Sequence, residues 1–187
     1  MLRDIRKPFF NKGGTNMTNI KKITTPLTDE VVKGLKAGDQ VSISGVIYTA
    51  RDAAHKLLTE AIQAGEELPV DFKNQIIYYA GPTPAKPGKV IGSCGPTTSG
   101  RMDAYSPLMM EQGLKGMIGK GPRSKEVVEA MIANHVVYFA AIGGAAALIA
   151  DSVKEAEVVA FDELGPEAIR RLVVEDYPCI VAIDSEG

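Results

Sequence analysis

Cysteine and histidine are scarce in this chain of 187 residues, and the shortage excludes several kinds of metal site. There are two cysteines, Cys94 and Cys179, and two histidines. The cysteines are too far apart for a CxxC pair, and with the histidines they form no recognisable zinc spacing. They also fall short of the three or four thiolates that usually hold an iron–sulfur cluster. We therefore expect no metal ligand in this chain and read both cysteines as buried free thiols.

Aromatic residues and net positive charge are also lacking. There is no tryptophan, aromatic residues make up 6% of the chain, and the formal net charge is −2. A nucleic-acid-binding protein normally presents a basic stripe and often aromatic platforms on which bases stack. The composition therefore argues against nucleic acid as a partner.

No apolar run is long enough for a membrane helix, which needs about 20 residues. The longest run covers 136–150, and a glycine pair at 143–144 divides it. Residues 1–16 are rich in charge and lack the apolar centre of a secretory signal. We expect a cytoplasmic protein without a membrane partner, with a mobile arm over 1–16 and one domain over 17–187.

Apolar periodicity predicts alternating strands and helices. Apolar residues at even spacing or in short runs indicate strands, and a stripe at a spacing of three to four indicates a helix. Expected strands are 41–47, 75–79, 89–92, 115–118, 136–140, 157–161 and 179–183; expected helices are 29–35, 53–62, 102–112 with an interruption at Pro107, 124–132, 143–150 and 166–175. This alternation predicts an α/β fold with a mainly parallel central sheet.

One short loop is the richest in chemistry. Residues 95–103 read GPTTSGRMD and combine two glycines, three adjacent hydroxyls and Arg101. Backbone N–H groups, hydroxyls and a guanidinium fork at the start of a helix suit a carboxylate or a phosphate. The simpler alternative is a tight turn in which Thr98 or Ser99 caps the helix. Asp103 could then hold Arg101 by an ion pair.

Three motifs follow strand-like runs. Arg51 comes after the run 46–48, the 95–103 loop after 90–91, and Lys120 after 117–118. Because the ends of parallel strands gather at one edge of a sheet, these groups are expected to converge there. Two cations beside a hydroxyl-rich loop suit a dicarboxylate. For either cation alone, a solvated surface charge is the simpler interpretation. His55 could orient Asp52 or contact a carboxylate, and a helix-surface or capping role is equally open.

The same residues resemble a known family. The 95–103 loop, Gly119-Lys120-Gly121 and the segment 51–55, which reads RDAAH, are similar to the beta subunit of iron–sulfur-dependent hydro-lyases. These are the class I fumarases and the L(+)-tartrate dehydratases, and the resemblance covers about 20–187. It implies a swivelling β/β/α domain. It also implies a 4Fe-4S cluster held by a partner alpha subunit, activity only with that subunit, and an alpha2beta2 assembly.

The resemblance also implies roles for individual residues. Arg51, Thr98 and Arg101 would bind substrate carboxylates, and Lys120 would support the same anion or the departing hydroxyl. Thr97 matches the threonine proposed to take the proton from the carbon beside a carboxylate. A threonine hydroxyl is a poor base unless a neighbour activates it. Thr97 is therefore expected to act in catalysis, either as the base or as a relay to a carboxylate of the partner.

Three functions remain open on these grounds. The first is the beta subunit of a fumarate hydratase that interconverts fumarate and (S)-malate. The second is the beta subunit of an L(+)-tartrate dehydratase that forms oxaloacetate, because the motifs do not distinguish the two substrates. The third is a non-catalytic anion-binding module that kept the fold without the partner. An alpha-type chain that carries three cluster cysteines would separate the enzymes from the module.

Overall fold

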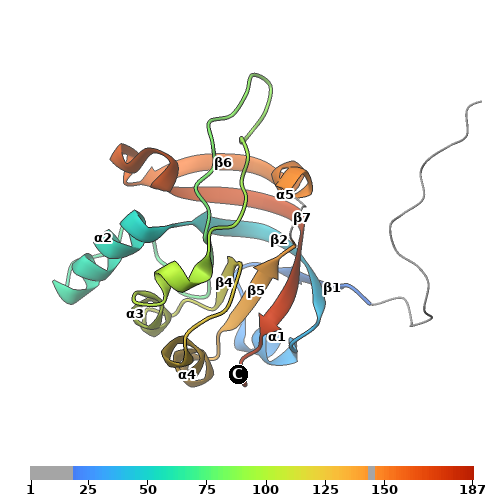
Figure 1. Ribbon diagram of the computed structural model, residues 1–187, viewed down its shortest axis with the longest axis vertical. Coiled ribbons are helices and arrows are strands. Elements are labelled where there is room, and N and C mark those ends of the chain that lie inside the picture. The colour runs from blue at the N-terminus through green and yellow to red at the C-terminus, as the bar shows by residue number, and fades with distance from the viewer. Residues whose placement is uncertain (1–18, 143–145) are drawn as a thin grey trace, which may run out of the picture.

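The computed structural model describes residues 19–142 and 146–187, and these form one sheet of seven strands with helices around it (Figure 1). The expected arm over 1–16 and the glycine pair at 143–144 lie outside the described residues. The strands are β1 (Lys21–Thr24), β2 (Gln40–Thr49), β3 (Ile76–Tyr78), β4 (Gly116–Gly119), β5 (Val137–Ala141), β6 (Val153–Ala160) and β7 (Ile169–Ile183).

The sheet is mixed and partly closed as a barrel. Strands β1 to β5 pair in sequence order, and each of these four pairings is parallel. The long strand β7 runs antiparallel to β5, to β2 and to β6. Because β7 joins β5 back to β2, the strands β2, β3, β4, β5 and β7 form a ring. The α/β class is confirmed, whereas the prediction of a mainly parallel sheet holds only for the first five strands.

Side chains of alternate residues in the strands build two separate cores. In β3, Ile76 and Tyr78 belong to the core inside the ring, and Ile77 belongs to the core outside it. In the same way, Ile118 of β4 faces inward and Met117 faces outward. This period of two is the ordinary geometry of a strand whose faces are both buried.

Helices cover both cores. The helices are α1 (Asp29–Gly34), α2 (Asp52–Gln63), α3 (Ser106–Glu111), α4 (Lys125–Asn134) and α5 (Ala146–Ser152), with 3-10 helices η1 (Ser99–Met102) and η2 (Asp162–Glu167). Apolar residues of α2, α3 and α4 fill the outer core, and those of α1 and α5 join the inner one. Among these helices, none is long and apolar enough to cross a membrane.

Two predicted elements are wrong. The segment 166–175 was expected to be a helix, but from Ile169 onward it belongs to β7. Its pairings with β2 and β6 outweigh the helical spacing of its apolar residues, since tertiary context overrides local propensity. The segment 89–92 was expected to be a strand. It lies instead in a loop that folds back on itself, where Gly92 N–H donates to Thr83 O at 3.2 Å.

The other predicted elements are present, with shifted ends. Pro107 does not interrupt a helix: the expected helix over 102–112 is the turn η1 followed by α3, and Pro107 stands in the first turn of α3, where its missing N–H costs nothing. Thr28 and Ser124 stand directly before α1 and α4 and cap them: their hydroxyls accept from the N–H of Val31 and Val127, at 3.2 and 3.3 Å. The predicted swivelling of the domain stays a prediction, because one arrangement of the chain does not test a movement.

Candidate active site

The predicted site begins where β2, β3 and β4 end side by side. Arg51 lies two residues beyond β2, and Lys120 directly follows β4. Between them the chain leaves β3 at Tyr79, whose N–H donates to Ile118 O at 2.9 Å. Because these three strands are parallel neighbours, their carboxyl ends share one edge, as the sequence predicted for Arg51 and Lys120.

The 95–103 loop reaches this edge without a strand before it. Thr97 N–H donates to Tyr79 O at 2.6 Å, and Ser99 N–H donates to Lys120 O at 2.9 Å. A parallel bridge also joins Thr98 to Lys120. The loop therefore lies across the ends of β3 and β4. The expected convergence with Lys120 is found, but it depends on these backbone bonds and not on a strand at 89–92.

The three adjacent hydroxyls of the loop have different environments. Ser99 is fully buried, and its hydroxyl bonds the Tyr138 hydroxyl at 2.8 Å. Tyr138 in turn donates to Gly121 O at 2.8 Å, so Ser99 acts as the donor in the first bond. Thr97 is half-buried and Thr98 is exposed, and neither hydroxyl bonds another described residue. Neither Thr98 nor Ser99 caps η1 with its side chain, so the simpler cap interpretation is wrong.

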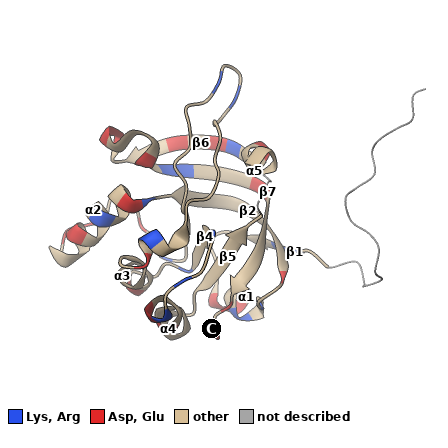
Figure 2. Cartoon of the chain, in the orientation of Figure 1, with Lys and Arg blue, Asp and Glu red and all other residues tan. Residues whose placement is uncertain are grey.

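Four charged residues meet at the N-terminal end of α2 (Figure 2). Asp52 lies in the first turn of α2, and its Oδ1 accepts from Nε of Arg101 at 3.0 Å. Its Oδ2 lies 3.7 Å from Nη2 of Arg51. Glu167 of η2 lies 3.9 Å from Nε of Arg51 and accepts from the N–H of Ala53 at 3.4 Å. Two arginines from distant segments are thus brought together by acidic side chains.

Gly81 leaves room for Arg51. A Cβ built on Gly81 would lie 3.0 Å from Cδ of Arg51 and 3.2 Å from the carbonyl oxygen of Pro166. The Arg51 side chain is therefore enclosed between the chain after β3 and η2, and it keeps 24% of its surface exposed. The sequence offered no signal for either Gly81 or Glu167 in this role.

The ion pair expected between Asp103 and Arg101 is absent from the described residues, because Asp103 pairs with Arg123. Nε of Arg123 donates to Oδ1 of Asp103 at 2.7 Å, and the Ser124 N–H donates to the other carboxylate oxygen at 2.8 Å. The Arg123 side chain has no exposed surface. This pair joins the 95–103 loop to the start of α4, and sequence analysis did not identify it.

Further contacts make Arg123 the centre of a buried polar cluster. Its Nη2 donates to the Ser106 hydroxyl at 2.8 Å and to the Tyr79 hydroxyl at 3.3 Å. The guanidinium carbon also lies 5.3 Å from the ring centre of Tyr79 and 5.0 Å from that of Tyr138, within the range of a cation–π contact. The cluster holds the 95–103 loop, which carries Thr97 and Arg101, against Tyr79, Ser106 and the start of α4.

His55 lies beneath Arg51 and is buried, so of the roles left open by the sequence the helix-surface role is wrong. Its ring is fully buried, and Nδ1 lies 2.9 Å from the carbonyl oxygen of Arg51. A carbonyl only accepts, so Nδ1 carries the proton and Nε2 faces the interior without a partner among the described residues. Burial lowers the pKa of His55 to about 4. The histidine is therefore neutral near pH 7.

The thiols do not fit a metal cluster. Cys94 and Cys179 are both buried, and burial raises the pKa of Cys94 to about 12 and that of Cys179 further. A cluster needs thiolates, which this environment disfavours. Over 19–142 and 146–187, no three His, Cys, Asp or Glu side chains lie close enough to hold a metal ion. That this chain contributes no ligand to a cluster stays a prediction.

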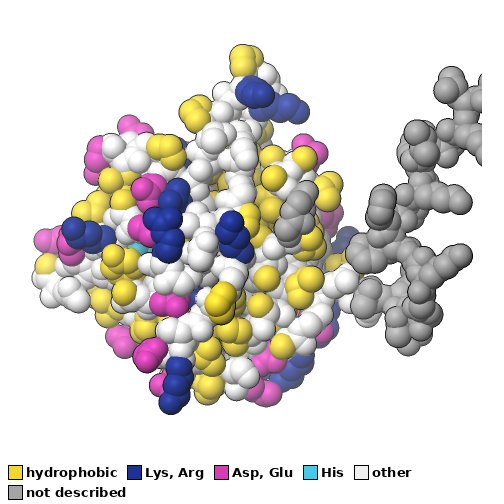
Figure 3. Space-filling view, viewed as in Figure 1, with side chains coloured by type: hydrophobic (Ala, Val, Ile, Leu, Met, Phe, Trp, Pro, Cys, Tyr) yellow, Lys and Arg dark blue, Asp and Glu magenta, His cyan; other side chains and the backbone are white. Residues whose placement is uncertain are grey.

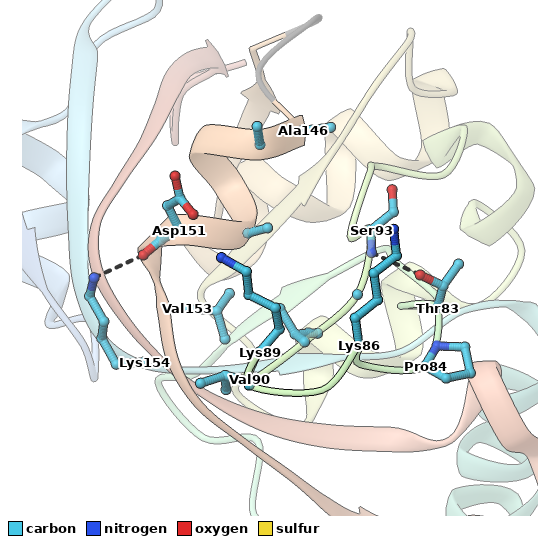
Figure 4. A pocket seen from close by; sticks show the side chains of 15 residues that line it. Thr83, Pro84, Lys86, Lys89, Val90, Ser93, Ala146, Asp151, Val153 and Lys154 are labelled. Carbon is cyan, nitrogen blue, oxygen red and sulfur yellow. Dashed lines mark hydrogen bonds between the residues drawn. The ribbon is translucent and has the colours of Figure 1, made fainter.

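One groove lies away from these residues. It has a volume of about 560 Å³ and runs between the loop over 83–93 and α5, with Lys86, Lys89 and Lys154 among its lining residues (Figure 4). None of the five predicted site residues lines it. In Figure 3, Lys and Arg side chains lie near the middle of the face shown, and hydrophobic side chains gather beside α5. The candidate site, with Thr98, Arg101 and Lys120 exposed, is thus a polar surface separate from this groove.

Comparisons with known proteins agree with the motifs. A family model described as the fumarase C-terminus matches residues 6–187. The putative L(+)-tartrate dehydratase subunit beta of Methanocaldococcus jannaschii is 46% identical over 167 residues, which are 86% of this chain and 86% of that protein. This relative is therefore matched over most of its length.

Other relatives are longer proteins. The anaerobic class I fumarate hydratase of Escherichia coli is 45% identical over 150 residues, which are 79% of this chain and 27% of that enzyme. Fumarate hydratase 2 of Leishmania major is 42% identical over 152 residues, 80% of this chain and 27% of the enzyme. The chain thus spans about a quarter of the length of these fumarate hydratases.

Proposed function

The chain belongs to the fumarase C-terminus family, and from that premise we propose that it is the beta subunit of a class I fumarate hydratase. With a cognate alpha subunit it would interconvert fumarate and (S)-malate. One observation carries the proposal: Arg51, Arg101 and Lys120, from three distant segments, lie with the 95–103 loop at one edge of the sheet. Such a group of cations and free hydroxyls suits a substrate with two carboxylates.

Each residue has a proposed role that its surroundings support. Arg101 binds one carboxylate through its guanidinium fork, with Thr98 donating to the same group. Arg51 binds the second carboxylate. Lys120 is exposed and has no ion pair within the described chain, so its ammonium is free for the substrate or for the departing hydroxyl. The Thr97 hydroxyl bonds no other described residue, and we assign to it the proton transfer at the carbon next to a carboxylate.

Loss of hydroxide needs a Lewis acid, and the buried thiols of this chain are poor ligands for one. We propose that a 4Fe-4S cluster on the alpha subunit supplies it. The active site is then completed at the interface between the subunits. The open, polar surface around Arg101 and Lys120 supports this, because a finished site for a small molecule is normally enclosed. We expect two copies of each subunit in the complex.

The second candidate is an L(+)-tartrate dehydratase beta subunit. It is favoured by the similarity to a protein named as such, which this chain matches over 86% of both lengths. Malate and tartrate both have two carboxylates, and tartrate has one hydroxyl more. The residues assigned here bind the carboxylates, so the selection would fall to other groups, including those of the alpha subunit.

Assay of the assembled enzyme tests both candidates. The chain is co-expressed with its cognate alpha subunit under anaerobic conditions, and the complex is assayed with malate, fumarate and both tartrates. We expect turnover of malate and fumarate, a complex mass that corresponds to two copies of each chain, and iron only where the alpha subunit is present. Turnover of tartrate alone would select the second candidate. A complex with no turnover of any of the four, or about four irons in the isolated beta chain, would refute the proposal.

A further inference from the structure

We infer that Asp52 is a positioning residue that orients Arg101, and with it Arg51, for a dicarboxylate; this rests on the proposed function. Asp52 belongs to the first turn of α2, where the helix dipole favours a carboxylate. Arg101 is 49 residues away in sequence, yet its Nε lies 3.0 Å from Oδ1 of Asp52. This bond connects the loop that carries Thr97 and Thr98 to the element that carries Arg51.

The nitrogen used in this bond decides what Arg101 offers a ligand. A guanidinium has five N–H donors in a rigid plane. Asp52 takes the one on Nε, and the four on the two terminal nitrogens make no hydrogen bond to another described residue. These terminal nitrogens form the fork that fits a carboxylate with two parallel bonds. Asp52 therefore fixes the plane of the guanidinium and leaves its binding edge open.

Two buried polar atoms beside each other make no hydrogen bond to any described residue. They are Oδ2 of Asp52, which lies 3.7 Å from Nη2 of Arg51, and Nε of Arg51. Buried polar atoms in folded proteins are nearly always bonded, so this arrangement does not resemble a purely structural ion pair. A substrate carboxylate could accept from Nε of Arg51, and a small shift of Arg51 on binding would bring Nη2 within hydrogen-bond distance of Oδ2.

Two roles for Asp52 predict opposite effects. If Asp52 positions Arg101, its removal lets the guanidinium move and weakens substrate binding. If Asp52 instead neutralises the two arginines and competes with the substrate, its removal strengthens binding. The sign of the change in KM therefore distinguishes positioning from competition.

The experiment uses the anaerobically assembled complex with the Asp52→Ala and Asp52→Asn variants. Misplacement of a binding group by about 1 Å can cost roughly 100-fold, so we expect Asp52→Ala to raise KM for malate by roughly 10- to 100-fold, with a smaller effect on kcat. Asp52→Asn should raise it less, because the amide oxygen still accepts from Nε of Arg101. Glu60→Ala is the matched control: this exposed carboxylate lies on the same helix and pairs with Lys56 at 3.9 Å.

A double-mutant cycle separates positioning from simple damage to α2. Combined with Arg101→Lys, the Asp52→Ala change should add less than about twofold in KM, since coupled residues are not additive. Fully additive effects, an unchanged KM or a lower KM would overturn the inference.

Calorimetric binding of succinate, an unreactive dicarboxylate, keeps the test independent of turnover. If the wild-type complex turns over no substrate, the proposed function fails, and succinate still decides the role of Asp52. Weaker succinate binding by Asp52→Ala supports the inference. Equal or tighter binding, or no succinate binding by the wild type, overturns it.

Discussion

Two arginine–aspartate pairs tie the 95–103 loop to other segments, and they differ in burial and in hydrogen bonding. Nε of Arg123 lies 2.7 Å from Oδ1 of Asp103, and the Arg123 side chain has no exposed surface. Arg101 and Asp52 lie 3.0 Å apart, and the Arg101 side chain is 55% exposed. In the buried pair, both oxygens of Asp103 accept hydrogen bonds, and Arg123 also donates to Ser106. In the exposed pair, the terminal nitrogens of Arg101 and Oδ2 of Asp52 make no hydrogen bond to a described residue.

The contrast indicates a division of work within one loop. Asp103 faces the interior and joins the loop to the start of α4; we call this the inner side of the loop. Arg101, two residues earlier, is exposed at the candidate site, on what we call the outer side. Breaking a buried pair leaves an uncompensated charge in the interior, which is costly, while an exposed pair contributes little to stability. Substitutions on the inner side should therefore lower the free energy of unfolding. Substitutions on the outer side should change the kinetics of the complex.

The largest expected effect is a loss of turnover when the Thr97 hydroxyl is removed. Thr97→Val keeps the shape of the side chain and removes the hydroxyl that we assign to proton transfer. In the complex, kcat should fall by roughly 10²–10⁴, as for loss of a general base, with KM little changed. Steady-state kinetics at matched cluster content measure this. Near-normal turnover would remove Thr97 from the chemistry and leave the loop as a carboxylate site only.

Ser99→Ala is the matched control for Thr97. It removes an inner hydroxyl of the same loop, one that bonds Tyr138 at 2.8 Å. It should lower the free energy of unfolding by about 1 kcal/mol, as for one neutral hydrogen bond, and affect kcat far less than Thr97→Val does. Equal losses of kcat in the two variants would contradict the division between inner and outer residues.

The inner arginine should dominate stability. Arg123→Met fills a similar volume but leaves Asp103 without its cation, and loss of one partner of a buried pair costs about 3–5 kcal/mol. Urea denaturation of the isolated chain measures the change in the free energy of unfolding. Arg101→Met, the same substitution in the exposed pair, should cost less than about 1 kcal/mol. Similar losses for both would mean that burial does not separate the two pairs.

The buried His55 makes the stability of the fold depend on pH. Burial lowers the pKa of His55 to about 4 in the folded chain, against an ordinary value of 6.5. Between these values the unfolded chain binds a proton that the folded chain does not, so stability falls as the pH drops from 6.5 towards 4. A shift of this size corresponds to roughly 3 kcal/mol.

Denaturation at pH 7 and pH 4.5 checks the role of His55. Wild type should lose stability over this interval, and His55→Phe should lose clearly less. An identical pH dependence for wild type and His55→Phe would show that the buried histidine does not contribute.

The last prediction concerns substrate binding by the exposed Arg101, and its expected effect is smaller than those of Thr97→Val and Arg123→Met. Arg101→Lys keeps the charge and removes the planar fork, which a lysine cannot reproduce. KM should rise by a factor that corresponds to about 2–3 kcal/mol, the value of a hydrogen bond between charged groups. Kinetics with malate and fumarate measure it. A KM within about twofold of wild type would mean that a point charge suffices and that the orientation of the guanidinium is unimportant.

Local features of the fold were predictable because their energies lie within a few residues. Thr28 and Ser124 stand directly before α1 and α4, and each hydroxyl accepts from an N–H three residues on. Here the residue type at the start of an apolar helical stripe carries the information. The meeting of the 95–103 loop with Lys120 was also expected, but it depends on backbone bonds between distant segments and not on the strand expected at 89–92.

Long-range pairing was not predictable from these patterns. The segment 166–175 has apolar spacing that fits a helix, and only the edges offered by β2 and β6 make it part of β7. Asp103 was assigned to the nearby Arg101, whereas it pairs with Arg123, twenty residues on, and Arg101 pairs with Asp52. The nearest opposite charge in sequence is a poor guide when the chain brings others closer in space.

The sequence by itself determined which chemical groups this protein carries, where β2 to β5 and most helices lie, and which family its motifs resemble, but it did not indicate β1. Only the tertiary structure decided which face of the loop each group occupies, that β7 closes the ring, and that His55 is buried and neutral. The physical reason is the range of the interactions. Caps, turns and apolar periods act over about four residues, while burial, ion pairing and strand pairing depend on segments that only the folded chain brings together.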